Sequence, residues 1–334
     1  MHVGLIGTGR IGALHARTLA ANELVSRLTI VDVDAARSAA IATELRAAQA
    51  ESAAALFAER LDAVVIAAPT PAHADLLHMA ADANVQAFCE KPIALDLAST
   101  DDVIGHIERA GIFVQIGFQR RFDAGYRAAH DACKSGALGD VHVIRLATHD
   151  PAPPPDAYVA ASGGLWRDLA IHEFDIAAWV LGSPIAEVFA FGLAHGEVFA
   201  RNHDVDAAAA TLRFENGTVG ALTATRNDAR GCDVRMEVFG LRDSIAVGWN
   251  EQTPLRSVEP GVQPPVRPGY RDFIQRFEPA YHAEIDTFLE AMRSGGASPC
   301  PVADARAALA VAVAADCSMR QQRPVRVDEF AVTR

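Results

Sequence analysis

The spacing of Asp168 and His172 is suited to moving a proton. The two residues stand four apart in a segment that is predicted to be helical, so both side chains would face the same way. A carboxylate that contacts one imidazole nitrogen fixes the tautomer and supports the imidazolium once it forms. The pair therefore predicts that His172 can act as a general base toward an alcohol proton. An aspartate that caps a helix beside a packed histidine is the alternative, and the spacing alone favours neither.

A glycine-rich turn near the start of the chain predicts a dinucleotide site. An apolar run at residues 2–6 leads into the turn, and a helical stretch at residues 13–21 follows it; the turn reads Gly7-Thr8-Gly9-Arg10-Ile11-Gly12. This strand–turn–helix pattern brings the backbone close to a pyrophosphate and points a helix N-terminus at it. The alternative is an ordinary turn between a strand and a helix.

Asp32 bears on which dinucleotide binds. It ends the apolar run at residues 28–31 and lies 20 residues after Gly12, where a carboxylate can accept hydrogen bonds from an adenosine ribose. A carboxylate there would repel the 2′-phosphate of NADP. Arg37 is nearby, but it falls on a helix predicted at residues 34–45 and is expected to be solvated. The sequence therefore favours NAD over NADP.

Glu90 and Lys91 come directly after an apolar run at residues 85–89. Such a run predicts a buried strand, and packing does not explain two charges at its end. Pro92 disfavours the α conformation at Lys91 and can hold the turn. An ammonium group there would favour alkoxide character on a substrate oxygen as a hydride leaves. A surface ion pair in a loop is the alternative.

Further polar residues follow other strands at the same predicted edge of the sheet. Thr70 and His73 come after the run at residues 63–67, and Arg120 and Arg121 come after the run at residues 113–116. The two arginines could clamp a cofactor or a substrate, or they could form ion pairs at a domain junction. No metal site is predicted, because the segment around His172 offers one histidine and two aspartates on a single turn.

Composition narrows the class of protein. With 334 residues, 50% hydrophobic and 22% charged, the chain is expected to form a two-domain globular enzyme. A net charge of −12 argues against nucleic acid as a partner. The five cysteines are scattered and form no C-x-x-C pair, which suits a reducing cytosol and predicts a cytoplasmic protein. Neither a signal peptide nor a membrane span is expected, because the first strand begins at residue 2 and the apolar stretch at residues 302–317 contains charges.

The order of the predicted elements indicates an α/β fold with two domains. In residues 1–118, apolar strands alternate with amphipathic helices, which predicts a doubly wound parallel sheet of the Rossmann type. Residues 119–334 contain mainly consecutive strands between residues 185 and 247, which predicts an α+β domain with an open, mainly antiparallel sheet. Its helices are expected at residues 125–136, after Ser162-Gly163-Gly164 to Leu181, at 281–294 and at 302–321, with a long proline-rich loop at 252–268.

Together these motifs resemble the glucose-fructose oxidoreductase / inositol dehydrogenase / rhizopine catabolism (Gfo/Idh/MocA) family over nearly the whole chain. The residues that carry the resemblance are Gly7-x-Gly9-x-x-Gly12 with His15, Thr70-Pro71-x-His73, Glu90-Lys91-Pro92, and Gly163-Gly164 with Asp168, His172 and Asp175. Within the family the chain looks most like the bacterial inositol 2-dehydrogenases, on the segments at residues 117–126, 168–176 and 276–285.

The resemblance implies NAD-linked oxidation of one ring hydroxyl of a cyclic polyol or sugar. It implies Lys91, Asp168 and His172 as catalytic residues, with Asp168 orienting His172. The substrate is expected to contact Lys91, Asp150, Asp168, His172 and Tyr281. The cofactor is expected to contact Gly7, Thr8, Gly9, Arg10, Ile11, Asp32, Thr70, His73, Glu90, Lys91 and Arg120. A homodimer or homotetramer built through the open sheet is also implied.

Inositol is the first expectation for the substrate, but the pocket departs from the inositol pattern. Asp150 stands where those enzymes tend to carry asparagine, and Arg230 and Cys232 stand where they carry aromatic residues. Another polyol, an amino-sugar or an acidic sugar is therefore an alternative. Two further alternatives are an NAD-dependent glycosidase and a dinucleotide-binding regulator without turnover, although a pure binder does not need all three catalytic residues.

Overall fold

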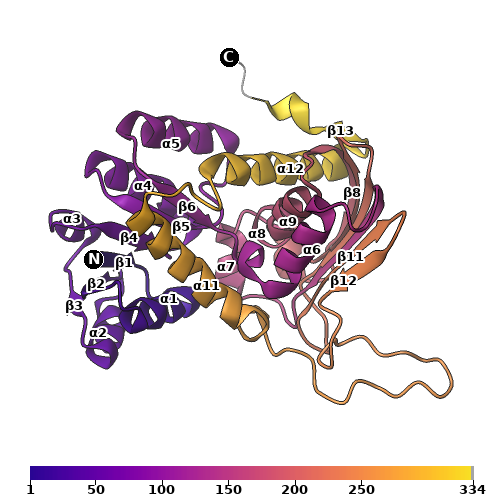
Figure 1. Cartoon of the computed structure of the whole chain (residues 1–334), viewed down its shortest axis with the longest axis horizontal. Coiled ribbons are helices and arrows are strands. Elements are labelled where there is room, and N and C mark those ends of the chain that lie inside the picture. Colours follow the sequence, from indigo (N-terminus) through magenta and orange to yellow (C-terminus); the bar gives the residue numbers. More distant parts are fainter. Residues whose placement is uncertain (332–334) are drawn as a thin grey trace. The chain divides into compact units, whose positions relative to one another are not determined.

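The computed structural model describes residues 1–331, and Figure 1 shows their helices and strands. The chain folds into two compact units. Unit 1 comprises residues 1–122 and 279–306, and unit 2 comprises residues 123–278 with the described residues from 307 onward. The return of residues 279–306 to the first unit is not visible in the order of predicted elements, because only tertiary packing assigns a helix to one core or another.

Unit 1 is built on a six-stranded parallel sheet with the order β3-β2-β1-β4-β5-β6. Its strands are β1 (His2–Ile6), β2 (Arg27–Val31), β3 (Ala48–Gln49), β4 (Ala63–Ile66), β5 (Gln86–Glu90) and β6 (Val114–Gly117). The strand order reverses between β1 and β4, and ligands of such sheets bind at this switch point, beyond the carboxyl ends of the strands. The predicted Rossmann-type sheet is confirmed.

Helices cover this sheet because its strands are apolar on both faces. They are α1 (Arg10–Ala21), α2 (Ala35–Leu45), α3 (Ala53–Phe57), α4 (His73–Asp82) and α5 (Leu97–Ala110), with short 3₁₀ turns η1 (Thr70–Ala72) and η2 (Gln119–Phe122). From Pro279 onward, helix α11 (Phe273–Ser294) belongs to unit 1 and completes its core. Its Ile285, Phe288 and Leu289 lie in one buried cluster with residues of β1 and α1. Each such side chain contributes about 1.5–3 kcal/mol on burial, which explains why this late segment belongs to unit 1.

Unit 2 contains a seven-stranded sheet with the order β12-β11-β7-β10-β9-β8-β13. Its strands are β7 (Val141–His149), β8 (Ile185–Leu193), β9 (Ala207–Phe214), β10 (Val219–Thr225), β11 (Asp233–Gly240), β12 (Ser244–Val247) and β13 (Val325–Arg326). Only β7 and β10 pair in parallel; the other pairs are antiparallel. The prediction of a mainly antiparallel sheet is confirmed.

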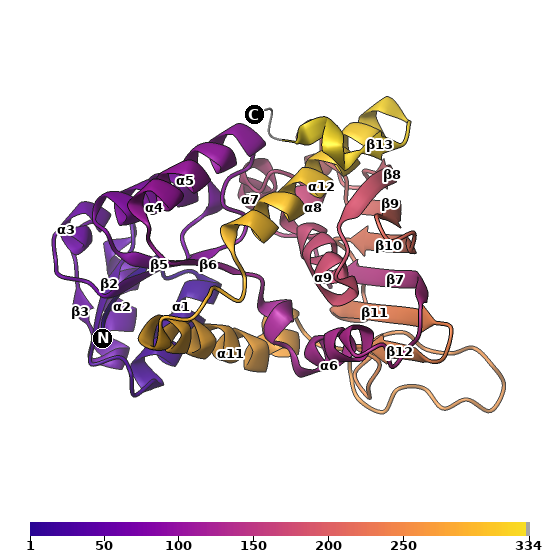
Figure 2. The same cartoon turned by 45° about the horizontal axis from the view of Figure 1, so that its top comes forward.

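One face of this sheet is covered by helices. The helices of unit 2 are α6 (Ala124–Lys134), α7 (Asp156–Ala161), α8 (Leu165–Asp168), α9 (Ile171–Leu181), α10 (Glu197–Arg201) and most of α12 (Val302–Gln321), with a 3₁₀ turn η3 (Val327–Phe330). Figure 2 shows α6 and α9 on one side of the strands. Residues of β9 and β10 alternate between buried and exposed, so the opposite face is open to solvent in the described chain.

Two predicted helix boundaries are wrong. Residues 165–181 form two helices, α8 and α9, that are separated at Leu169 and Ala170, rather than one. Helix α11 begins at Phe273, eight residues before the predicted start at Tyr281. Pro279 lies inside this helix. A proline can be kept inside a helix when packing compensates for the hydrogen bond it removes, and Phe277 and Ala280 on either side of it are buried.

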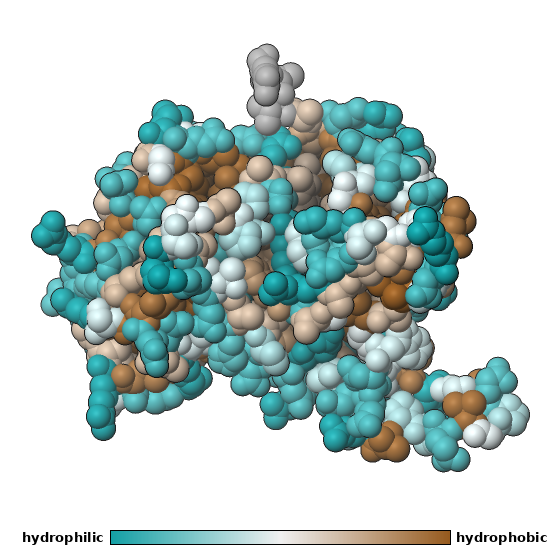
Figure 3. All heavy atoms as spheres, viewed as in Figure 1, coloured by the Kyte–Doolittle hydropathy of each residue, from teal (hydrophilic) through white to brown (hydrophobic). Residues whose placement is uncertain are grey.

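The loop between β12 and α11 extends from the sheet with several exposed apolar residues, as Figures 1 and 3 show. These are Leu255, Val258, Val262 and Val266. No helix of the described residues is long and apolar enough to cross a membrane.

Candidate functional site

The glycines of the turn after β1 serve different purposes. A Cβ atom at Gly7, where φ is +94°, would lie 2.6 Å from the carbonyl oxygen of Ala67, and a Cβ atom at Gly12 would overlap the carbonyl of Gly7. These two glycines are therefore required by the packing of the backbone itself. A Cβ atom at Gly9 would meet nothing within 4 Å. The space in front of Gly9 is open to a ligand, as the pyrophosphate-binding role requires.

Helix α1 begins at this open space. Gly9 is its N-cap residue, and no side chain caps the helix. The first N–H groups of a helix have no partner within the helix, and they carry its positive dipole end. The turn and α1 can therefore hold the pyrophosphate of a dinucleotide through backbone N–H groups. Thr8, Arg10 and Ile11 stand in or beside this turn, as predicted.

Asp32 closes the nucleotide side of the same turn. Its Oδ2 accepts hydrogen bonds from Thr8, from the N–H at 2.6 Å and from the hydroxyl at 2.8 Å. Its Oδ1 accepts from the Asp34 N–H and from Arg37 Nη2, at 2.9 and 3.0 Å. Burial acts to raise the pKa of Asp32, but these hydrogen bonds outweigh it and hold the pKa below its usual range. Arg37 is exposed, as predicted, and its guanidinium also pairs with Asp32.

Glu90 and Lys91 stand at the carboxyl end of β5, as predicted. The segment after them is held by His73, the first residue of α4. The Nδ1 atom of His73 lies 2.7 Å from the carbonyl oxygen of Pro92, and Nε2 lies 2.8 Å from that of Ala68. Burial lowers the pKa of His73, against the opposing effect of the two carbonyls. Both ring nitrogens thus contact protein, and His73 links the loop after β4 to the loop that carries Lys91.

Three other predicted residues lie in unit 1. Thr70 begins η1 after β4, and Arg120 is buried in η2 after β6, so both follow strands at the ligand-facing edge. Tyr281, in α11, is buried, and its hydroxyl accepts a hydrogen bond of 3.0 Å from Gln119 Nε2. Tyr281 therefore belongs to the same unit as Lys91.

Asp168, in unit 2, is the centre of a buried charged network. Its Oδ2 accepts a hydrogen bond of 2.6 Å from Arg226 Nη2, and its Oδ1 accepts one of 2.8 Å from the hydroxyl of Tyr158. Arg226 also donates from Nη1 to Asp150 Oδ2 at 3.0 Å. The guanidinium of Arg226 therefore joins two aspartates that were predicted as site residues for separate reasons. It holds the Asp168 carboxylate in one orientation.

The electrostatics of this network keep its charges in place. Burial acts to lower the pKa of Arg226, but Asp168 and Asp150 raise it on balance, so the guanidinium stays charged. Burial, and then the charge of Asp168, raise the pKa of Tyr158. Tyr158 is therefore a hydrogen-bond donor to Asp168 and not a base. The formal charge of Asp150, Asp168 and Arg226 together is −1.

His172 lies in the first turn of α9, whereas Asp168 ends α8. The expectation that both stand on one continuous helix is wrong. The turn before α8 determines where that helix starts. Gly163 and Gly164 both have positive φ, and a Cβ atom at Gly164 would lie 2.8 Å from Asp204 Oδ1, which caps the Leu165 N–H at 2.9 Å. The two glycines thus let α8 start where Asp204 can cap it.

The sequence analysis missed Arg226 and Tyr158. Arg226 directly follows the alternating strand β10, as Lys91 follows β5, and a charge directly after a strand was the available signal. Tyr158 lies in α7, a short helix that was not predicted from the sequence. Of the two departures from the inositol pattern in this region, Cys232 is buried, and the Arg230 Nε donates to the Pro254 carbonyl at 2.5 Å.

Removing the guanidinium of Arg226 should strongly destabilise the protein. In Arg226→Met, the carboxylates of Asp150 and Asp168 lose a buried partner, and we expect a loss of about 3–5 kcal/mol in the free energy of unfolding. Arg213→Met is the matched control, because Arg213 pairs with Glu187 on the exposed face of the same sheet and should cost less than about 1 kcal/mol. Denaturant unfolding of both variants measures the difference; equal losses would contradict the assigned role.

Two family models match this chain, one in each of its predicted domains. Residues 1–118 match the model described as "Oxidoreductase family, NAD-binding Rossmann fold". Residues 126–246 match the model described as "GFO/IDH/MocA C-terminal domain". The first match contains the glycine turn, Asp32 and Lys91, and the second contains Asp150, Asp168, His172 and Arg226.

Individual relatives match over almost their full lengths. The chain is 34% identical to a myo-inositol 2-dehydrogenase from Thermotoga maritima, over 98% of this chain and 99% of the relative. A crystal structure of a myo-inositol dehydrogenase from Corynebacterium glutamicum superposes with a TM-score of 0.90 at 31% identity, covering 98% of each chain. A scyllo-inositol dehydrogenase from Lactobacillus casei, solved with NAD(H) and scyllo-inositol, has a TM-score of 0.88 at 27% identity, covering 98% of this chain and 99% of that one.

Proposed function

Because the chain belongs to the Gfo/Idh/MocA oxidoreductase family, with an NAD-binding Rossmann domain, we propose that it oxidises one ring hydroxyl of an inositol to a ketone. The observation that carries the proposal is the buried network in which Arg226 and Tyr158 hold the Asp168 carboxylate. Any buried carboxylate needs hydrogen-bonded partners, and these two donors hold the Asp168 carboxylate in one orientation, as the proposed role of orienting His172 requires. Lys91 and His172, the other residues of the family's catalytic set, are both present.

In the proposed reaction each of the three residues has one task. His172 takes the proton of the reacting hydroxyl as general base. Asp168 orients the imidazole and supports its positive charge once the proton has arrived. Lys91 directs its ammonium group at the reacting oxygen and favours alkoxide character. NAD, when bound, accepts the hydride from the carbinol carbon.

We propose NAD rather than NADP as the coenzyme used. The Asp32 carboxylate is held ionised by its hydrogen bonds to Thr8 and Asp34, and it would repel a 2′-phosphate. The guanidinium of Arg37 pairs with Asp32 and is therefore not directed at a 2′-phosphate. We expect kcat/KM for NAD to exceed that for NADP at least tenfold, about 1.4 kcal/mol; a preference for NADP would overturn this assignment.

Two features support an uncharged polyol over an amino-sugar. The relatives named above are inositol dehydrogenases. The acid that distinguishes this chain, Asp150, already has a cationic partner in Arg226. A cationic substrate group is therefore not required to balance Asp150.

The experiment is a panel of inositols, aldoses and amino-sugars with NAD, followed by NADH absorbance. Steady NADH formation with myo- or scyllo-inositol supports the proposal, and turnover of an amino-sugar alone would move the assignment to the alternative substrate class. A glycosidase would release sugar from a glycoside without accumulating NADH, and a regulator would bind NAD with no turnover of any member.

We also propose that the protein is a homo-oligomer that pairs through the open face of the unit 2 sheet. Apart from Arg213, the exposed side chains of β9 and β10 on that face are small or apolar, beside Phe191 and Leu193, which are 58% and 56% exposed. A shallow hollow lies over these residues and Thr223. Apolar patches of this kind mark interaction surfaces.

Phe191→Asp should therefore lower the molar mass in sedimentation by a half or more, because it places a charge in the buried interface. Leu241→Asp is a matched control on an exposed apolar residue of the β11–β12 turn and should leave the mass unchanged. A monomeric wild-type protein would contradict the proposed assembly. A cytoplasmic location is part of the same proposal and is supported by the five cysteines, three of them buried, for which the described chain shows no disulfide bond.

A further inference from the structure

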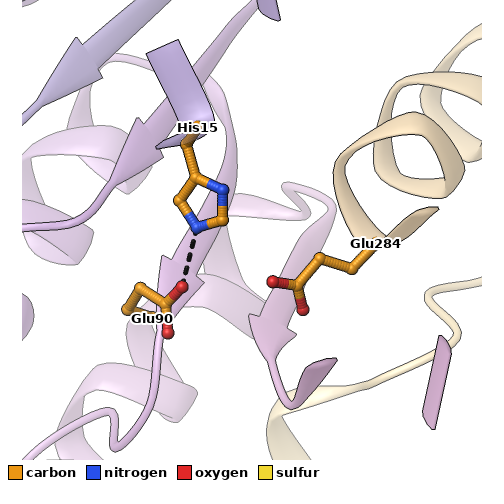
Figure 4. Close-up of side chains that lie close together, drawn as sticks. All are labelled: His15, Glu90 and Glu284. Atoms are coloured by element: carbon orange, nitrogen blue, oxygen red, sulfur yellow. Dashed lines mark hydrogen bonds and ion pairs between the residues drawn. The ribbon is translucent and has the colours of Figure 1, made fainter. Parts of the chain in front are cut away.

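A buried cluster of His15, Glu90 and Glu284 lies inside unit 1, behind the strand end that carries Lys91. Figure 4 shows the three side chains converging from three elements, α1, β5 and α11. One side-chain atom from each lies within 4.8 Å of the others. His15 and Glu284 are fully buried, and the side chain of Glu90 is 13% exposed. None of these three residues is used by the proposed mechanism.

The hydrogen bonding inside the cluster is uneven. The Nε2 atom of His15 lies 2.7 Å from Glu90 Oε1, so the imidazole N–H donates to this carboxylate. Among the described residues, neither carboxyl oxygen of Glu284 has a hydrogen-bond partner, although Figure 4 shows its carboxyl group pointing toward Glu90. A buried, unpaired carboxylate costs several kcal/mol and avoids this cost by taking up a proton. Burial, and then the negative charge of Glu90, raise the pKa of Glu284 well above its usual range.

A divalent cation would be the other way to balance two carboxylates. The geometry favours a proton on Glu284 over a bound cation. His15 Nε2 and Glu90 Oε1, the atoms that would coordinate a metal, are already joined by the 2.7 Å hydrogen bond. A metal ligand must be a deprotonated nitrogen, and Nε2 cannot both donate a hydrogen and bind a cation. The surroundings offer few other ligands: the rings of Phe88 and Tyr281 pack edge-on against His15.

We propose that Glu284 is a positioning residue for Lys91: as a neutral acid it closes the cluster with His15 and Glu90 and so fixes the end of β5. This inference rests on the role of Lys91 in the proposed function. Glu90 immediately precedes Lys91, and a Cβ atom at Gly117 of β6 would lie 3.0 Å from Glu90 Oε2, so the Glu90 side chain fits closely between its neighbours. Gln115 of β6 also donates to the Glu284 carbonyl at 3.1 Å. With Glu284 ionised, repulsion would push Glu90 away and move the backbone at Lys91.

The proton on Glu284 has a measurable consequence for stability. Above the ordinary glutamate pKa of 4.5, the unfolded chain releases this proton while the folded protein keeps it. The unfolded state then binds fewer protons, so the contribution of Glu284 to stability falls as pH rises. Glutamine does not titrate. The Tm of Glu284→Gln relative to the wild type should therefore increase from pH 4.5 to pH 7.5. The titratable groups that face Glu284 are His15 and Glu90. Both are the same in the two proteins, so the difference in Tm reports on position 284.

The same variants test the positioning role. Glu284→Gln keeps a neutral hydrogen-bond donor and should retain kcat within about threefold, with an unshifted pH profile. Glu284→Leu removes the donor at similar volume and should lower kcat on the order of ten- to a hundredfold, with little change in NAD affinity. If Glu284→Leu does not fold, the Tm trend and the pH profile of Glu284→Gln still test whether Glu284 acts as a neutral acid.

Three outcomes would overturn the inference. The first is a Tm for Glu284→Gln that falls relative to the wild type as pH rises, which would mean that Glu284 is ionised and paired. The second is stoichiometric Zn²⁺ or Mn²⁺ on the purified protein that Glu284→Gln abolishes. The third is unchanged kcat in folded Glu284→Leu, which would leave a structural role only. The Tm trend does not depend on Lys91, so an error in the proposed function would show separately, as normal turnover in a Lys91 variant.

Discussion

Lys91→Ala is expected to lower kcat by about 10³-fold, with modest change in NAD affinity. The physical reason is that the ammonium group stabilises negative charge that develops on the reacting oxygen only in the transition state. Removing one such group from an enclosed site costs about 10²–10³ in rate, roughly 2.7–4 kcal/mol. The measurement is steady-state oxidation of an inositol by NAD, together with a direct titration of NAD binding.

The chain offers an unusually clean control for this variant. It contains only two lysines, and the other, Lys134, is exposed at the end of α6 in unit 2. Lys134→Ala should leave kcat and Tm unchanged. Turnover of Lys91→Ala near the wild-type level would remove Lys91 from the reaction. Loss of NAD binding with preserved kcat would make Lys91 a cofactor ligand only.

Replacement of His172 should have a similarly large effect. A positioned general base contributes about 10²–10⁴ to a rate, so His172→Ala should lower kcat within that range. In the wild type, log kcat should rise with pH with slope one and then level, because only the neutral ring can accept the proton. This rise should be absent from the residual activity of His172→Ala.

His142 provides the matched control, since it is an exposed histidine on β7 of the same unit. His142→Ala should keep both the rate and the pH profile of the wild type. A flat profile in the wild type, with chemistry shown to be rate-limiting by a substrate isotope effect, would contradict the role of His172. A profile that persists in His172→Ala would assign the titration to another group.

The parts of the site that the sequence predicts are those set by local backbone chemistry. Gly7 and Gly12 are dictated by close backbone contacts within one turn, and Asp32 follows at a spacing set by one strand–helix–strand unit. Lys91 is conspicuous because a charge after a buried strand has no packing explanation. In each case the partners lie near in sequence or at the common edge of a parallel sheet, where chain order predicts proximity.

The contacts that the sequence did not predict join residues far apart along the chain. Arg226 reaches Asp168 across 58 positions and Asp150 across 76, and no periodicity encodes such a pairing. Glu284 faces His15 and Glu90 only because α11 packs into unit 1 through its apolar face. The break between α8 and α9 was missed for a related reason, since neither glycine nor proline marks Leu169 and Ala170.

The most direct test of the central claim follows a single hydrogen atom. The purified protein is given NAD and an inositol that carries deuterium at the carbinol carbon oxidised in the panel, and the products are examined by mass spectrometry. We predict a ring ketone together with NADH that contains one deuterium on the nicotinamide ring. NADH without deuterium, or a ring product that keeps the label while NAD is unchanged, would contradict the proposed dehydrogenase.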